Sequence, residues 1–363
     1  MKVKPLRKRE DEEWMHLVGG AVTSPADLRL KFGDKMRGLD SVTERFPMRV
    51  NSYYLSLIEK AGDSIFRQCI PDSRELSDEG LIDPLEEEEH SPVPGLTHRY
   101  PDRVLFLVSS RCAVYCRFCN RRRKVGRPDV VTPETIREGL AYIRANKDIR
   151  DVLLSGGDPL LLSDKELFRI LTDLRAIPHV EIIRIGSRVP CTLPQRITPG
   201  LAEMLKGFHP LYINAHFNHP RELTCEAAAA CSRLADAGIP LGCQTVLLKG
   251  VNDDPFVMKS LMQGLLKMRA KPYYLFQADL VKGTSHFWTP LERGLEIMNA
   301  LQGHTSGMCL PHFAVDLPHG GGKVPFLPNY VEEKKDNGLV LRTFEQKRHF
   351  YPLFCLGKGD LND

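Results

Sequence analysis

Short apolar runs alternate with amphipathic stretches through most of this chain. β-branched and aliphatic residues dominate runs at 104–108, 151–154, 181–185, 211–215, 241–247, 272–277 and 309–315. Between them, apolar residues recur at helical spacing in 132–146, 163–176, 199–208, 222–237, 254–268 and 290–301. This alternation is typical of repeated β/α units around a parallel sheet. We therefore predict an α/β fold, a partial and open TIM-like barrel of about six parallel β/α units.

The two ends of the chain differ from this central pattern. Residues 1–98 are charged and helical in character, interrupted by prolines near the acidic run at 86–89, and we predict a helical N-terminal appendage with a linking arm. The acidic run itself is expected to be a solvated face. The barrel should occupy 99–323, and the mixed polarity of 324–363 predicts a C-terminal appendage.

Polar and ionisable residues stand where most of the predicted strands end. TIM-like barrels place their active sites at the C-terminal ends of the strands. The residues at these positions are a cysteine loop after 108, Ser155-Gly156-Gly157-Asp158, the stretch 184–188, His216, Gln244, Asp279 and Asp316. We expect one end of the barrel to carry the active site.

Cys112, Cys116 and Cys119 form a C-x3-C-x2-C motif that supplies three thiolates. A structural zinc site normally has four protein ligands, whereas a cluster iron without a protein ligand can bind a substrate. No second C-x2-C or H-x3-H pair is present to complete a zinc site. Ordinary buried thiols and a zinc knuckle are the alternatives, and the spacing favours an iron–sulfur cluster with an open iron.

Composition narrows the class of protein further. The net charge is +4 over 363 residues with interspersed charges, which does not indicate nucleic-acid binding. The N-terminus has basic residues without an apolar segment, and no run approaches the roughly 18 apolar residues of a membrane span. With ten cysteines and no secretion signal, we expect a reducing, cytoplasmic location and no membrane contact.

Two segments carry a resemblance to a known family. Residues 93–103, Val-Pro-Gly-Leu-Thr-His-Arg-Tyr-Pro-Asp-Arg, and residues 115–123, Tyr-Cys-Arg-Phe-Cys-Asn-Arg-Arg-Arg, resemble the lysine 2,3-aminomutase family of radical S-adenosylmethionine enzymes. The similarity runs from about residue 15 to about residue 342. It implies that the three cysteines hold a [4Fe-4S] cluster whose fourth iron binds S-adenosylmethionine. It also implies contacts to that ligand from Ser155, Gly156, Gly157, Asp158, His216 and Gln244.

A lysine beside three glycines is the second strong feature. Read by itself, Gly320-Gly-Gly322-Lys323 is typical of a flexible exposed turn. The resemblance implies that Lys323 carries pyridoxal 5'-phosphate through an imine, which requires an amine nucleophile. Arg99, Tyr100 and Arg103 match positions that contact this cofactor, and guanidinium groups suit a phosphate.

The substrate is inferred from the remaining charges. By resemblance, Asp279 and Asp316 face the ε-ammonium of lysine, and Arg121 pairs with its carboxylate; two carboxylates suit one desolvated cation. Arg122 and Arg123 are expected to be surface charges. The resemblance thus implies an L-lysine 2,3-aminomutase, an isomerase that interconverts L-α-lysine and L-β-lysine by a 1,2-amino shift started by a 5'-deoxyadenosyl radical.

Some departures and alternatives remain. The cysteines needed for a structural zinc site are missing, because Asp254 follows the Gly-Val-Asn-Asp loop and Cys355 is the only cysteine in the tail. We therefore predict no structural zinc. We also expect a homo-oligomer and a reductant such as flavodoxin or ferredoxin. Phe118 and Phe276 replace a histidine and a tyrosine of the family. Alternatives are the same chemistry on arginine or ornithine, β-lysine supply for modifying a translation factor, and a non-catalytic iron–sulfur or zinc-binding protein.

Overall fold

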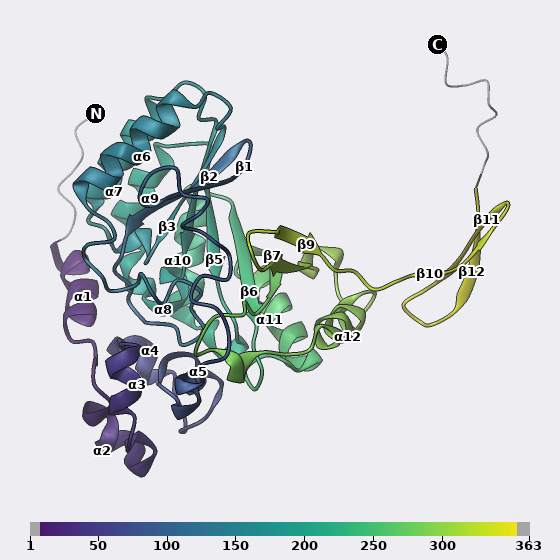
Figure 1. Cartoon of the computed structure of the whole chain (residues 1–363), viewed down its shortest axis with the longest axis horizontal. Helices are drawn as coiled ribbons and strands as arrows, with labels where there is room; N and C mark the ends of the chain where they lie inside the picture. The colour runs from purple at the N-terminus through teal and green to yellow at the C-terminus, as the bar shows by residue number, and fades with distance from the viewer. Residues whose placement is uncertain (1–7, 354–363) are drawn as a thin grey trace.

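A nine-stranded sheet forms the centre of the molecule, with its strands in the order of the chain from β1 to β9. The computed structural model describes residues 8–353 (Figure 1). Strands β2 to β8 run parallel, and β1 and β9 are added antiparallel at the two edges. The strands are β1 Leu96–Tyr100, β2 Arg103–Ser109, β3 Asp151–Gly156, β4 Ile182–Ser187, β5 Leu211–His216, β6 Leu241–Leu247, β7 Ala270–Gln277, β8 His312–Leu317 and β9 Gly322–Pro325. Because the edges β1 and β9 are not paired with each other, the barrel is open, and the predicted fold class is confirmed.

Helices follow the strands and cover the outside of the barrel (Figure 1). They are α6 Pro133–Ala145, α7 Asp164–Arg175, α8 Val189–Thr192, α9 Pro199–Lys206, α10 Cys225–Asp236, α11 Pro255–Lys267 and α12 Leu291–Leu301. Thr132 and Thr198 cap α6 and α9, because each hydroxyl accepts a hydrogen bond from a backbone N–H that has no partner within the helix. Each helix also has proline in its first turn, where the missing N–H of proline costs no hydrogen bond. The predicted strand at 309–315 begins only at His312, since Gly307–Cys309 form a 3-10 turn.

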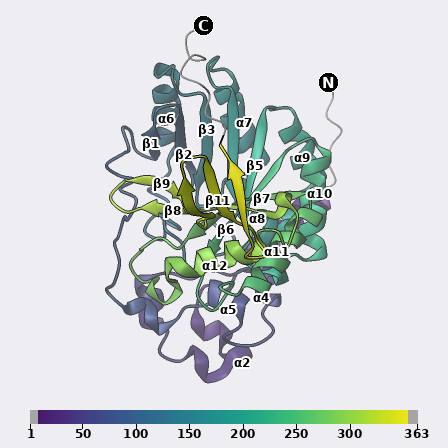
Figure 2. The same ribbon diagram turned by 90° about the vertical axis from the view of Figure 1, so that its right-hand side faces the viewer.

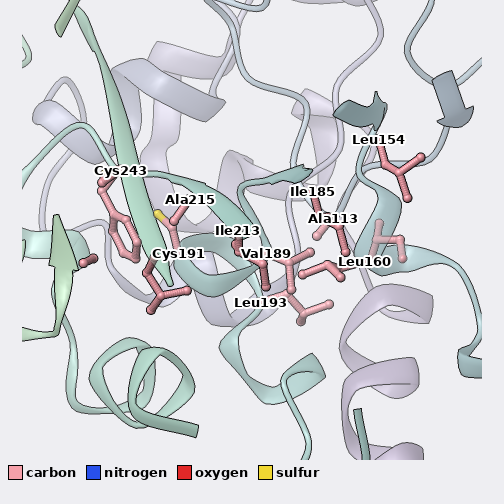
Figure 3. Close-up of a cluster of buried hydrophobic side chains, with 14 of the residues drawn as sticks. Ala113, Leu154, Leu160, Ile185, Val189, Cys191, Leu193, Ile213, Ala215 and Cys243 are labelled. Carbon is pink, nitrogen blue, oxygen red and sulfur yellow. The ribbon is translucent and has the colours of Figure 1, made fainter. Parts of the chain in front are cut away.

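Buried and less buried side chains alternate along the strands. In β5, Leu211, Ile213 and Ala215 are buried, while the intervening positions up to His216 are less so. The outward side chains of β3 to β6 form a continuous core with α8 and the turn before α7, shown in Figure 3 around Ile185, Ile213 and Cys243. The period-two pattern of each strand therefore buries its apolar face under the helices and leaves its inner face for polar groups.

The N-terminal segment is helical and ends in an arm, residues 77–95, that leads to β1. Its helices are α1 Lys8–Gly19, α2 Arg29–Phe32, α3 Asp40–Arg45, α4 Ser52–Ser56 and α5 Ser64–Cys69. The arm then passes the ends of β7 and β8: Leu81 bridges to Val281, and the His319 N–H donates to the carbonyl of Pro84 at 3.0 Å. The arm is thus attached to loops that follow barrel strands.

The prediction of a solvated acidic run is wrong at its centre. Glu87 is 4% exposed, although Glu88 beside it has a 61% exposed side chain. Arg121, Arg123 and Lys124 approach the Glu87 carboxylate, so the loop that follows the cysteines supplies the charge that permits its burial.

The C-terminal segment forms a second sheet. Strands β10 Val331–Lys335, β11 Gly338–Arg342 and β12 Arg348–Pro352 pair antiparallel and stand away from the barrel in Figure 1; Figure 2 shows them from their own side. Cys355 lies outside the described residues. Among residues 8–353, no helix is long and apolar enough to cross a membrane. The division of the chain at residues 98 and 323 stays a prediction.

The N-terminal segment is joined to the cysteine loop by a buried ion network. Glu75 is 0% exposed and its carboxylate accepts from Arg117 and Arg122, each at 2.5 Å. The Arg122 guanidinium also lies 3.7 Å from the ring centroid of Phe46. The expectation that Arg122 and Arg123 are surface charges is therefore wrong, since the folded N-terminal segment and the arm cover both side chains.

Replacing Glu75 by alanine is expected to destabilise the fold by about 3–5 kcal/mol, because two buried guanidinium groups lose their counter-charge. Urea denaturation followed by circular dichroism measures this. Asp78→Ala removes an 80% exposed carboxylate that pairs with Arg45 and Lys282 nearby, and it should leave the midpoint almost unchanged. Equal midpoints for the two variants would contradict this account.

Candidate active site

The three motif cysteines lie on the loop that follows β2. Cys112, Cys116 and Cys119 line one small cavity of about 50 Å³ together with Arg117 and Arg122. Burial raises the pKa of Cys112, and raises that of Cys119 to about 11. Thiols at one cavity, which release their protons when iron binds, suit a cluster. No set of three His, Cys, Asp or Glu side chains within residues 8–353 is arranged to hold a single metal ion.

Arg188, the last residue of the predicted strand-end stretch 184–188, follows β4 and reaches this loop. Its Nη1 donates to Cys116 Sγ at 2.7 Å, and its Nη2 donates to Glu222 Oε1 at 2.8 Å and to Gln68 Oε1 at 2.6 Å. Glu222 also accepts from Tyr54. An arginine after an apolar run was the only signal in the sequence, because its partners come from three distant segments.

The glycines after β3 are required by the protein's own backbone. Gly156 has a φ of +131°, and a Cβ there would lie 2.0 Å from the carbonyl oxygen of Ser109. A Cβ on Gly157 would lie 2.4 Å from the carbonyl oxygen of Arg111. The end of β3 therefore packs directly on the start of the cysteine loop, which places Ser155 to Asp158 beside Cys112.

Asp158 is occupied by structural hydrogen bonds. It accepts from Ser187 Oγ at 2.7 Å and from the backbone N–H groups of Leu160, Arg188 and Val189. Burial nevertheless raises its pKa to about 6. Within the predicted group Ser155 to Asp158, this carboxylate holds the turn after β4, the turn that carries Arg188.

His216, the last residue of β5, is the register partner of Gln244, which lies in the middle of β6 rather than at its predicted end. His216 Nε2 lies 3.0 Å from Asn218 Oδ1, and burial together with the Arg188 charge lowers its pKa to about 3. Its ring centroid is 5.7 Å from that of Phe118 in the cysteine loop. The fold thus brings a neutral imidazole and an amide to the edge of the cysteine site.

Lys323 lies in β9 rather than in a free loop. Its backbone N–H donates to Tyr100 Oη at 3.0 Å, and its Nζ donates to Asp316 Oδ2 at 2.6 Å. Asp316 and Lys323 are register partners across the β8–β9 hairpin. The flexible-turn interpretation is therefore wrong for Lys323, since the glycines form a tight hairpin that presents its amine to β8.

Lys323 opens on a cavity of about 400 Å³ inside the barrel. The basic residues that line this cavity are Arg99, Arg103, Arg121, Arg184 and Lys323, beside Tyr100 and the acidic Glu87 and Asp151. The Arg103 guanidinium stacks at 4.0 Å from the Tyr100 ring centroid, and Arg184 pairs with Asp151 at 2.8 Å. A cavity of this size with an amine, aromatic walls and a cation excess suits pyridoxal phosphate.

The two predicted substrate carboxylates meet near this lysine. Burial first, and then the charge of Asp316, raises the pKa of Asp279 to about 6. Asn120 Nδ2 donates to Asp279 Oδ2 at 2.9 Å, and Arg99 Nη1 lies 3.8 Å from Asp316 Oδ1. Asn120 was not predicted, because nothing in the sequence marks an amide next to a cluster cysteine as a partner of Asp279 in the loop after β7.

Comparisons with known proteins show the family to which this chain belongs. A family model described as "Radical SAM superfamily" matches residues 106–258, and one described as "Lysine-2,3-aminomutase" matches residues 298–353. The chain is thus a radical S-adenosylmethionine enzyme. It is 52% identical over 345 residues to an L-lysine 2,3-aminomutase of Fusobacterium nucleatum. The matched region covers 93% of this chain and 81% of the relative. The chain belongs to the lysine 2,3-aminomutase family, which confirms the resemblance.

Two further relatives and one solved structure are also similar to this chain. An L-lysine 2,3-aminomutase of Clostridium subterminale is 52% identical over 86% of this chain and 76% of its own length. A glutamate 2,3-aminomutase of Clostridioides difficile is 50% identical over 85% of this chain and 74% of its own length. Among solved structures, SuiB of Streptococcus suis matches 61% of this chain and 50% of its own, with 12% identity and a TM-score of 0.44.

Family membership makes this chain an aminomutase, an isomerase that uses a [4Fe-4S] cluster, S-adenosylmethionine and pyridoxal phosphate. The residues present fit these groups: three thiols share one cavity, and an amine stands in a second, cation-rich cavity.

Proposed function

We propose that this enzyme interconverts L-α-lysine and L-β-lysine in the cytoplasm. The paired carboxylates Asp279 and Asp316, next to Lys323, carry this proposal. Two neighbouring carboxylates repel each other when buried, and a substrate ammonium group relieves that repulsion. A substrate with an acidic side chain would add a third negative charge at this place, which disfavours glutamate.

We assign the cofactor contacts from the arrangement of the two cavities. Cys112, Cys116 and Cys119 hold the cluster, and Ser155 to Asp158, His216 and Gln244 form the adjoining wall for S-adenosylmethionine. Lys323 holds pyridoxal phosphate, with Arg99, Tyr100 and Arg103 around its phosphate. When bound, these groups supply the 5'-deoxyadenosyl radical and the carbonyl chemistry for the amino-group migration.

The protein's own contribution is to orient the substrate. Arg121 binds the substrate carboxylate, and the Asp279–Asp316 pair binds the ammonium group, so the carbon chain is held between two fixed charged groups. Phe276 has its ring centroid 5.3 Å from Lys323 Nζ and stacks on Tyr274. An aromatic ring is therefore still beside the Lys323 amine where family members carry tyrosine.

Anaerobic turnover assays on the reconstituted enzyme test the substrate. We expect lysine to give the β-amino product, and arginine, ornithine and glutamate to react at least about a hundredfold more slowly, because each misplaces or reverses the side-chain charge. If lysine does not react while arginine or ornithine does, the proposed substrate is wrong and the substrate that reacts takes its place.

Cofactor analysis separates the enzyme from a non-catalytic metal protein. About four irons per chain together with lysine-linked pyridoxal phosphate are expected. Bound zinc without pyridoxal phosphate would contradict the enzyme. We further propose a flavodoxin- or ferredoxin-type reductant and a homo-oligomer without structural zinc, which native mass spectrometry with metal analysis can test.

A further inference from the structure

The orientation of Arg121 is set by a residue outside the barrel. Arg121 follows the cluster cysteine Cys119, and its Nε and Nη2 both approach Glu87 Oε1, at 2.7 and 2.6 Å. Its Nη1 remains directed toward Ser155 Oγ, 3.4 Å away at the end of β3. One edge of the guanidinium is therefore held by the arm, and the other faces the end of a barrel strand.

Glu87 keeps its charge although its side chain is only 5% exposed. Burial opposes ionisation, but the charges of Arg121, Lys124 and Arg123 outweigh it and lower the pKa of Glu87 to about 2. Arg123 Nη2 lies 3.3 Å and Lys124 Nζ 3.7 Å from Glu87 Oε2. The three neighbouring cations therefore favour the ionised form of the buried carboxylate.

The backbone on the N-terminal side of Glu87 is itself attached to the cavity. The Leu85 carbonyl accepts from Arg99 Nη2, and the Pro84 carbonyl accepts from the N–H of His319 in the β8–β9 turn at 3.0 Å. Leu85 and Glu87 both line the cavity that holds Lys323. The arm therefore contacts the cofactor side and the arginine side of one site.

We propose that Glu87 is a positioning residue that orients the Arg121 guanidinium so that its Nη1 edge receives the α-carboxylate of the substrate. This rests on the proposed role of Arg121. The cavity is also lined by other cations, namely Arg99, Arg103, Arg184 and Lys323. Without Glu87, the Arg121 guanidinium would therefore lose its nearest counter-charge and the contact that fixes the orientation of its plane. A guanidinium binds a carboxylate strongly only when its plane and edge are presented correctly.

Glu87→Gln and Glu88→Gln form a matched pair that tests this proposal. Both remove one negative charge from the same run, but Glu88 is 61% exposed and contacts Arg123 and Lys124 rather than Arg121. In holoenzyme, we expect Glu87→Gln to raise the lysine dissociation constant about tenfold, read from the absorbance of bound pyridoxal phosphate, and to raise KM alike with kcat changed less than about threefold. Glu88→Gln should change neither.

1,5-Diaminopentane separates positioning from a merely structural role, because it keeps both amino groups of lysine and lacks the carboxylate. We expect Glu87→Gln to leave its affinity unchanged. A loss of diamine affinity equal to that for lysine would overturn the proposal, and so would tighter lysine binding, which would show that Glu87 competes with the substrate for Arg121. If Glu87→Gln does not fold, Glu87→Asp, which keeps the charge on a shorter side chain, should show a smaller change of the same sign.

Arg121→Lys distinguishes the failure of this inference from the failure of the function it rests on. Unchanged lysine affinity in Arg121→Lys would remove the proposed role of Arg121. Weakened binding in Arg121→Lys beside unchanged binding in Glu87→Gln would overturn the positioning role alone. If Arg121 binds the carboxylate and Glu87 positions Arg121, the double variant Glu87→Gln with Arg121→Lys should bind lysine no more weakly than Arg121→Lys alone, because the two residues act as one unit.

Discussion

Lys323→Met should eliminate covalently bound pyridoxal phosphate and lower turnover by at least about a thousandfold, because thioether sulfur cannot form an imine. The Lys323 amine is also the partner of Asp316 Oδ2 at 2.6 Å, so its loss leaves a nearly buried carboxylate without that cation. Borohydride reduction followed by peptide mass analysis measures the covalent link, and anaerobic turnover of lysine measures the activity.

Lys323→Arg is the informative control for this prediction. Arginine keeps the positive charge opposite Asp316 but does not form a stable imine, so the fold should be retained while the covalent link and the activity are lost. Lys334→Met removes an exposed lysine in β10 and should behave as the wild type. Substantial activity in Lys323→Arg would show that a different residue holds the cofactor.

Asp279→Asn is expected to weaken lysine binding about a hundredfold or more while it stabilises the ligand-free protein. Asn120 donates to Asp279 Oδ2, and an amide at position 279 can still accept there. The variant therefore retains a hydrogen-bond acceptor and loses the charge that attracts the substrate ammonium. Spectroscopic titration with lysine and thermal denaturation without ligand measure the two effects.

The stability effect follows from the direction of the pKa shift. Burial and Asp316 raise the pKa of Asp279 from the usual 3.8 to about 6 in the folded protein. A carboxyl group shifted in this direction stabilises the fold while it is protonated, and that contribution is lost as pH rises through about 6. At neutral pH the ionised group costs about 3 kcal/mol, of which asparagine should recover a part.

The same shift predicts the pH dependence of substrate binding. As pH falls through about 6, Asp279 takes up a proton and the affinity for lysine should fall, whereas Asp279→Asn should bind lysine weakly and without this transition. Asp236→Asn removes an exposed carboxylate on α10, with a 70% exposed side chain, and should keep the wild-type profile. An unchanged profile in Asp279→Asn would assign the transition to another group.

The barrel could be predicted from the sequence because its signals are local. The pattern at 211–215 or 241–247 shows which face of a strand is apolar without reference to any other part of the chain, and these strands are found at Leu211–His216 and Leu241–Leu247. The polar residues at the strand ends followed from the rule for parallel barrels, which holds for His216 at the end of β5. Gln244 lies in the middle of β6 and is brought beside His216 by the register of the two strands.

Charge partners could not be predicted in this way. Glu75, Glu87 and Arg122 look like surface charges in the sequence, and burial next to opposite charge depends on residues far along the chain. Asp158 illustrates the same limit, because nothing in the sequence marks Ser187 and Arg188, in the turn after β4, as the hydrogen-bond donors to its carboxylate.

The sequence by itself therefore determined the β/α order, the three-cysteine motif and, through family resemblance, the lysine beside the glycines, since these depend on period, spacing and short motifs. Only the tertiary structure decided that the arm enters the site, that Glu87 holds Arg121, and that Arg188 reaches Cys116. The physical reason is that a charge can be buried only where folding brings its partner, and that partner has no fixed distance along the chain.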